Sequence, residues 1–76
     1  MKVTWEEKDI KSGRRFGKPN DNEIHIIGYI VPLEGPNVRT AVSLSDGGAW
    51  FQGTNAEMAK MLNSNEYLPV EILARK

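Results

Sequence analysis

Residues 11–20 gather basic side chains, glycines and one aromatic ring in a segment that contains no acidic residue. Its four positively charged residues are Lys11, Arg14, Arg15 and Lys18. Guanidinium groups can donate paired hydrogen bonds to phosphate or carboxylate oxygens, and the ring of Phe16 offers a face on which a nucleobase can stack. This composition predicts a site for an anionic partner, such as single-stranded nucleic acid.

The six aromatic residues are a second source of candidate binding residues, because a core of this size is too small to bury all of them. Aromatic rings left on a surface are typical of protein-binding patches and homodimer contacts. The candidates for such a surface are Tyr29, Trp50 and Phe51. Since Trp50 and Phe51 are neighbours in a predicted strand, we expect their side chains to point to opposite faces of the sheet.

The residues needed for a catalytic or metal-binding cluster are not present in a suitable pattern. The only histidine, His25, lies between two isoleucines of a predicted strand, and the chain has no cysteine. Neither a nucleophile–base arrangement nor a thiolate or imidazole metal site is indicated. Residues 13–18 lack the spacing of a phosphate-binding loop, and residues 20–23 lack the glycine and distal glutamate of a calcium loop. We expect no enzyme activity, no metal and no cofactor.

Apolar periodicity and turn residues predict five strands and one helix that would position these side chains. The first strand is expected at the start of residues 2–10, although residues 6–9 also fit a polar turn. Residues 11–22 are predicted to form a long loop, which is usually functional or mobile in so small a domain. The later strands are predicted over residues 23–31, 38–45, 49–52 and 67–74.

The predicted helix begins at a capping box, in which the side chains of Thr54 and Glu57 each accept a hydrogen bond from the other residue's backbone N–H. Apolar residues at helical spacing follow, namely Met58, Met61 and Leu62. We expect this face to lie in the core and residues 63–65 to end the helix. In the last strand, Pro69 has no N–H, which predicts a position at the edge of the sheet or one where the N–H is not needed.

The clearest alternation lies in residues 38–45. One set of side chains is mostly apolar and is expected to be buried: Val38, Thr40, Val42 and Leu44. The other set is expected to face solvent: Arg39, Ala41, Ser43 and Ser45. Residues 23–31 instead carry apolar side chains on both faces, and Gly28 at their centre predicts a bend or a bulge.

Five strands with a short helix before the last one predict a mainly β domain. We expect a single small five-stranded antiparallel barrel over residues 1–76, SH3-like in its strand order, with an OB-like order as the alternative. The preference depends on residues 49–52, because a strand there places the helix after the fourth strand rather than after the third.

Ten basic and ten acidic residues cancel, and this neutrality argues against a dedicated binder of duplex DNA. The charges are unevenly distributed: residues 1–20 hold six Lys or Arg and three Asp or Glu, whereas residues 21–71 hold two and seven. A local basic site is therefore compatible with the neutral total. The charged N-terminus differs from a secretion signal and no apolar run is long enough to cross a membrane, so we expect a cytoplasmic protein with no membrane partner.

Taken together, these patterns predict a non-catalytic small binding module. The first hypothesis is that residues 11–20 bind single-stranded nucleic acid or another anionic partner. The alternative is a protein-interaction or homodimerising regulatory module that uses exposed aromatic residues.

Overall fold

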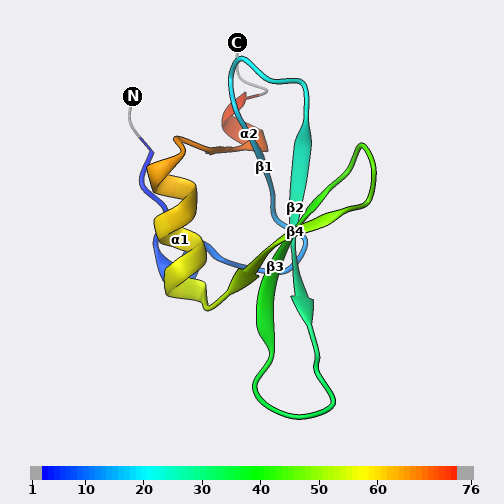
Figure 1. Cartoon of the computed structure of the whole chain (residues 1–76). Helices are drawn as coiled ribbons and strands as arrows, with labels where there is room; N and C mark the ends of the chain where they lie inside the picture. Colours follow the sequence, from blue (N-terminus) through cyan, green and yellow to red (C-terminus); the bar gives the residue numbers. More distant parts are fainter. Residues whose placement is uncertain (1–2, 74–76) are drawn as a thin grey trace.

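The computed structural model describes residues 3–73, which form one open antiparallel sheet and a helix that packs against one of its faces (Figure 1). The strands are β1 (Arg15–Gly17), β2 (Ile24–Ile30), β3 (Val38–Ser43), β4 (Ala49–Gly53) and β5 (Leu68–Pro69). Their order across the sheet is β4-β3-β2-β1-β5. The prediction of a mainly β fold, with five antiparallel strands and a short helix before the last strand, is confirmed.

The sheet is not closed into a barrel, so this part of the prediction is wrong. β4 and β5 lie at opposite edges of the sheet. Closure would require these two edge strands to pair along their length. β5 has only two residues, and its Pro69 has no N–H to donate, so the strand offers too little backbone for such pairing. The edge position predicted for Pro69 is confirmed.

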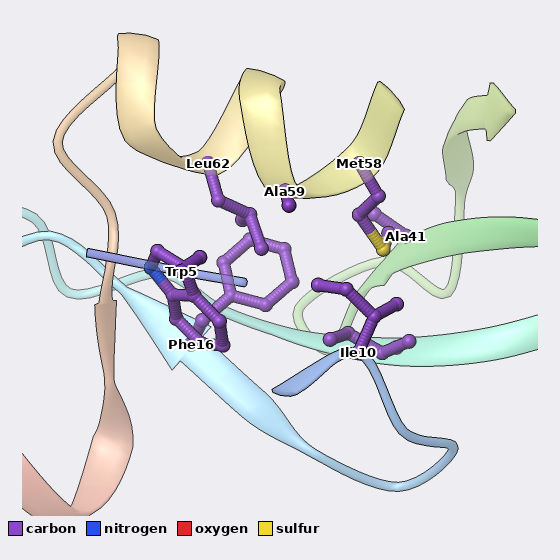
Figure 2. Close-up of a cluster of buried hydrophobic side chains, with 8 residues drawn as sticks. Trp5, Ile10, Phe16, Ala41, Met58, Ala59 and Leu62 are labelled. Carbon is purple, nitrogen blue, oxygen red and sulfur yellow. The ribbon is translucent and has the colours of Figure 1, made fainter. Parts of the chain in front are cut away.

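The core lies between the sheet and the helix α1 (Asn55–Ser64), as Figure 2 shows. The helix residues Met58, Ala59 and Leu62 are buried, and Met61 is half-buried, as the helical spacing predicted. The buried apolar residues of the sheet and of the N-terminal segment are Trp5, Ile10, Phe16, Ile27 and Ala41. Each large apolar side chain buried in this way contributes about 1.5–3 kcal/mol to stability. The covered face of the sheet is therefore the stabilising one.

α1 begins at the predicted capping box. Glu57 N donates to Thr54 Oγ1 at 3.1 Å, and Thr54 N donates to Glu57 Oε1 at 2.9 Å. The backbone hydrogen bond from Thr54, followed by the one with its side chain, lowers the pKa of Glu57. Because the pKa is lowered on folding, this contribution to stability is present above the ordinary carboxyl pKa and is lost as the pH falls through the lowered value. The cap fixes the point at which the chain leaves β4 and enters α1.

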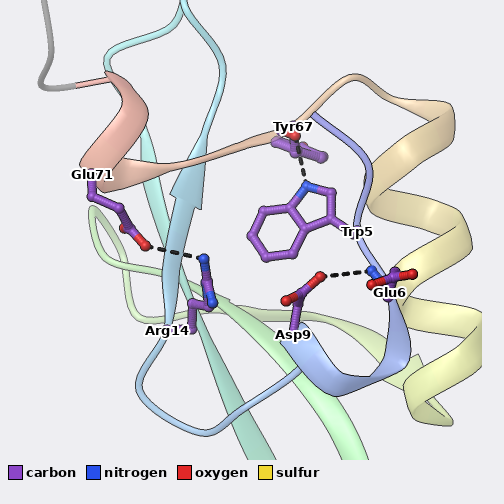
Figure 3. Close-up of polar contacts among 6 residues, drawn as sticks. All are labelled: Trp5, Glu6, Asp9, Arg14, Tyr67 and Glu71. Atoms are coloured by element: carbon purple, nitrogen blue, oxygen red, sulfur yellow. Dashed lines mark hydrogen bonds and ion pairs between the residues drawn. The ribbon is translucent and has the colours of Figure 1, made fainter. Parts of the chain in front are cut away.

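The N-terminal segment is not a strand. Its short 3-10 helix η1 (Glu7–Asp9) agrees with the polar turn considered for residues 6–9, and the first predicted strand is wrong. Trp5 is buried, and its backbone N–H donates to Asn63 Oδ1 at 2.7 Å. Its Nε1 donates to the Tyr67 carbonyl at 2.8 Å (Figure 3). The tryptophan thus attaches the segment to the end of α1 without strand pairing.

The loop predicted over residues 11–22 contains a strand. β1 pairs with β2 on one side, in the register Phe16↔His25, and with β5 on the other, in the register Phe16↔Pro69. Only one of the three β1 residues has a large apolar side chain, so no alternation was visible in the sequence. The ring of Phe16 is 0% exposed, and its burial under α1 holds the strand in place.

The strand predicted over residues 67–74 is limited to β5, because the chain turns into α2 (Val70–Leu73) directly after Pro69. α2 packs over β1 at Gly17, where a Cβ would lie 3.3 Å from Leu73 Cδ1 and 3.1 Å from the Glu23 carbonyl. The missing side chain of this glycine makes room for the short helix. Ala74, the end of the predicted strand, lies outside the described residues.

β2 is the central strand of the sheet, as predicted. Its residues His25 and Ile27 are buried on the side of α1, whereas Ile24 and Ile26 are half-buried on the opposite side. The pairing with β3 continues through Gly28 without an irregularity. The bend or bulge expected at this glycine is therefore not a feature of the strand pairing.

In β3, the side chains that were expected to face solvent point toward the core instead. The exposed fractions of Arg39, Ala41 and Ser43 are 6%, 0% and 3%. Ala41 lies between Ile27 of β2 and Phe51 of β4, on the side that α1 covers. The other set is covered less completely: Thr40 is buried, Val38 and Val42 are half-buried, and Leu44 is exposed. Alternation separates the two faces of a strand, but the packing of distant elements decides which face is covered.

An irregularity in the pairing of β3 with β4 places two neighbouring aromatic side chains on one face. Ala41 pairs with Phe51, but its neighbour in β3 pairs with Ala49, so Trp50 is an extra residue. Two residues of a bulged strand face a single residue of the partner strand. Trp50 therefore contacts His25 while Phe51 packs against the core. The prediction that these two side chains point to opposite faces is wrong.

Candidate functional site

Arg14, predicted to bind an anion, is engaged in contacts within the protein. Its Nη2 lies 3.1 Å from Glu71 Oε1, and its guanidinium carbon lies 5.3 Å from the centre of the Trp5 ring (Figure 3). The charge is paired with an acidic residue of α2, and the planar group covers the tryptophan. These contacts join the N-terminal segment to the C-terminal end of the described chain.

The other three basic residues of the segment lie in different directions. Arg15 is exposed opposite Ile26 of β2, on the face of the sheet that α1 does not cover. Lys18 follows β1, and its Nζ lies 4.9 Å from the centre of the Tyr67 ring. Lys11 is exposed in the turn before β1. Among the described residues, no shared hydrogen-bond or ion-pair partner joins two of these three side chains.

Phe16 is a core residue, so the prediction of an exposed stacking ring is wrong. The ring stacks on His25 at a centroid distance of 5.3 Å and makes edge contacts with Tyr67 at 5.0 Å and Trp5 at 6.2 Å. Strand pairing of β1 on both sides directs this side chain toward α1. No face of the ring is left for a nucleobase.

Anion binding by residues 11–20 stays a prediction with a direct measurement. We expect the affinity for a labelled single-stranded oligonucleotide, measured by fluorescence anisotropy, to fall as the salt concentration rises. Arg15→Ala should reduce this salt dependence more than Arg14→Ala, because Arg14 is already paired with Glu71. Absence of binding at low salt would contradict the prediction.

Trp50 and Phe51, predicted as interaction residues, take part in packing within the protein. Trp50 Nε1 donates a hydrogen bond to His25 Nδ1 at 3.1 Å, and the two rings lie 5.0 Å apart. The Trp50 ring also lies 6.2 Å from that of Tyr67. Trp50 remains 42% exposed and Phe51 is half-buried. Part of the Trp50 surface is accessible, but the indole has a structural role beside the imidazole.

An open depression next to these aromatic residues carries charges of both signs. Lys18, Asp21, Glu66 and Tyr67 contribute to its walls. Burial, together with the negative charges of Asp21 and Glu23, raises the pKa of Tyr67 above its ordinary value. The acidic groups beside Lys18 would repel an anionic ligand. This depression therefore does not extend the anion-binding site predicted for residues 11–20.

The described contacts of His25 and Ser43 do not form a nucleophile–base pair. His25 is 6% exposed and accepts its hydrogen bond from Trp50. Ser43 Oγ donates to Glu23 Oε1 and shares a 2.9 Å hydrogen bond with Ser45 Oγ. Residues 3–73 contain no group of three or more His, Asp or Glu that could hold a metal ion. Over the same residues, no helix has the length and apolar character needed to cross a membrane.

Three exposed large apolar side chains, including the two most exposed ones of the described residues, lie where β2 leads into the connection to β3. We define residues 29–38 as the β2–β3 arm, whose loop projects away from α1 toward the bottom of Figure 1. The exposed fractions of Tyr29, Val31 and Leu33 are 51%, 72% and 106%. Glu34 is the only Asp, Glu, Lys or Arg of the arm. Single exposed apolar residues are normal, but three at alternate positions of one hairpin are a candidate surface for protein contact.

Arg39, at the base of the arm, is a candidate residue that the sequence analysis missed. It is 6% exposed and donates from Nε to Asn55 Oδ1 at 2.8 Å, from Nη1 to Ser12 Oγ at 3.0 Å and from Nη2 to the Ile10 carbonyl at 2.9 Å. Its guanidinium carbon lies 3.7 Å from the centre of the Tyr29 ring. All three acceptors are neutral, and no carboxylate of residues 3–73 pairs with it. The base of the arm thus holds a buried positive charge with no counter-ion in the described chain.

A scan of the chain against family models found no match, and comparisons with curated proteins and with solved structures found no significant similarity.

Proposed function

We propose that this chain is a non-catalytic protein-interaction module that binds its partner through the β2–β3 arm. The observation that carries the proposal is the exposure of Tyr29, Val31 and Leu33 on a hairpin with a single charged residue. Burial of apolar surface is favourable by about 25 cal/mol for each Å² removed from water. Burial of these three side chains against a partner would therefore contribute a favourable term to the free energy of binding.

The shape of the molecule supports this proposal. The described chain measures 44 × 26 × 17 Å along its principal axes, and its radius of gyration is 12.3 Å. A compact chain of this length would have a radius of gyration of about 11.4 Å. The buried core lies between α1 and the sheet and includes no residue of the loop 31–37. The loop's apolar side chains are therefore free for a partner without cost to the core.

The proposal keeps one residue of the protein-interaction hypothesis from the sequence, and it keeps the SH3-like strand order. Tyr29 is the predicted interaction residue that lies on the arm, whereas Trp50 and Phe51 lie on β4. The pairing of β5 with β1 favours the SH3-like strand order over the OB-like one, in an open sheet. Binding residues are found disproportionately on loops that a rigid scaffold positions, and the arm is such a connection.

Photo-crosslinking from the arm tests the proposal. The full chain is produced in its own cells with benzoylphenylalanine in place of Val31 or Leu33. We expect ultraviolet light to link both variants to a protein, seen as a heavier band on a denaturing gel. The matched control carries the same group in place of Lys60, which is exposed on α1.

Adducts from positions 31 and 33, without the same adducts from position 60, are the expected result. Equal labelling from all three positions would indicate random contact, and no adduct from the arm would contradict the proposed function. The mass of an adduct also shows whether the partner is a second copy or another protein.

A further inference from the structure

We propose that the partner of the arm is a second copy of this chain, and that two arms pack side by side in opposite directions. This inference rests on the proposed function of the arm and adds the identity of its partner. In this arrangement Glu34 at the tip of one arm lies at the rim of the partner's Tyr29–Arg39 pair, at the base of the other arm. The same contact is repeated by symmetry, so the dimer is closed.

The charge of Arg39 is the first argument. A buried guanidinium is normally paired with an anion, because removing a charge from water is costly. Arg39 is 6% exposed, yet its hydrogen bonds are to an amide oxygen, a hydroxyl and a carbonyl, and no carboxylate of residues 3–73 pairs with it. The base of the arm therefore favours a negative group brought from outside the described chain.

The position of Glu34 is the second argument. It is exposed beside Gly35, which has a positive φ of 93° and marks the turn at the tip of the arm. No hydrogen bond or ion pair of the described residues involves its carboxylate. It is the only Lys, Arg, Asp or Glu in residues 24–38. Each copy thus offers one unpaired negative charge at the tip and one buried positive charge at the base.

The spacing along the arm fits an antiparallel pair. Leu33 follows Tyr29 by four positions, which corresponds to about 13 Å in an extended chain. When two arms run in opposite directions with Val31 near the two-fold axis, Leu33 of each copy meets the partner's Tyr29. The carboxylate that follows Leu33 then reaches the rim of the Tyr29–Arg39 pair.

A second copy would cover the exposed apolar side chains of the arm and also bring a carboxylate near Arg39, so no other protein is needed for either role. The formal net charge of the chain is zero, so association of two copies meets no overall repulsion. A standard stable interface buries about 800 Å² on each partner. One side of a ten-residue arm is smaller than this, so we expect a reversible dimer with a micromolar dissociation constant.

Sedimentation of the purified full chain is the first test. Between about 1 μM and about 1 mM we expect the average mass to rise from one copy to two. Glu34→Arg places a positive charge beside the partner's Arg39 and should weaken the dimer at least about tenfold. The control Glu7→Arg makes the same change of charge at an exposed position of η1, away from the arm, and should leave the dissociation constant unchanged.

Cysteine crosslinking is the second test, and the absence of natural cysteine makes it unambiguous. Only residues near a two-fold axis can form a disulfide with their own copy, because the two Cα atoms must lie within about 7 Å. Val31→Cys should therefore form a covalent dimer on mild oxidation much faster than Lys60→Cys. Glu34→Arg in the Val31→Cys chain should slow this reaction.

A monomer at all concentrations, together with no faster crosslinking of Val31→Cys than of Lys60→Cys, would overturn the second-copy proposal. The proposed function would then still stand if photo-crosslinking from the arm links a different protein. A dimer that Glu34→Arg does not weaken, or that crosslinks equally well at position 60, would also contradict the arm-to-arm arrangement.

Discussion

Phe16→Ala is expected to lower the free energy of unfolding by about 3–5 kcal/mol, the range for removing a buried aromatic ring from a core. The ring is 0% exposed and contacts Trp5, His25 and Tyr67. A chain of 76 residues has a total stability of roughly 4–11 kcal/mol. The variant should therefore lose a large fraction of its stability and unfold at a lower urea concentration than the unmodified chain, which urea denaturation followed by tryptophan fluorescence would measure.

Val31→Ala is the matched control, because it also shortens an apolar side chain but at a position that is 72% exposed. At a low protein concentration, where dimer formation does not contribute, we expect its free energy of unfolding to lie within about 0.5 kcal/mol of that of the unmodified chain. If Phe16→Ala behaved like this control, the ring would be a surface group, as the basic-loop hypothesis required. The measurement therefore separates the core role of Phe16 from the predicted stacking role.

Arg39→Ala has the second large expected effect, a loss of about 2–3 kcal/mol in the free energy of unfolding. The substitution leaves the Ile10 carbonyl without its buried donor, and such an unsatisfied group costs about 1–3 kcal/mol. The contact of the side chain with the Tyr29 ring is lost as well. Urea denaturation at low protein concentration measures this effect without a contribution from dimer formation.

Two further variants show whether the shape of the guanidinium matters. Arg39→Lys keeps the charge, but a single ammonium group cannot reach Asn55, Ser12 and the Ile10 carbonyl together. We expect it to recover less than half of the loss. Arg15→Ala, the same substitution at an exposed arginine, should change stability by no more than about 0.5 kcal/mol. A comparable loss in Arg15→Ala would show that the effect is not specific to the buried position.

Local elements were predicted best where the signal lies within a few neighbouring residues. The capping box of Thr54 and Glu57 marks the start of α1, because its hydrogen bonds join residues three positions apart. β2, β3 and β4 were predicted from the alternation of their side chains and from the turn residues between them. β1 was missed because its pairing with residues of β2 and β5, rather than its own composition, makes it a strand.

The candidate site was predicted only in part, for the same reason. Tyr29 was chosen as an exposed aromatic residue, and it lies at the start of the arm. Val31, Leu33 and Arg39 were not chosen, although residues 24–45 carry only two formal charges, Glu34 and Arg39. An isolated arginine in such a segment is a signal that sequence reading could have used. Its burial, however, depends on Asn55, Ser12 and Ile10, which are distant in the chain.

The sequence by itself determined the strands β2, β3 and β4, the helix α1 with its cap, the edge position of Pro69 and the two sets of side chains along β3. Only the tertiary structure decided that the set with Arg39 and Ala41 is buried, that Phe16 belongs to the core and that the sheet stays open. The physical reason is that periodicity reflects backbone geometry between near neighbours. Burial and the pairing of charges depend on which distant segments meet, and here that depends on α1 covering one face and leaving the arm uncovered.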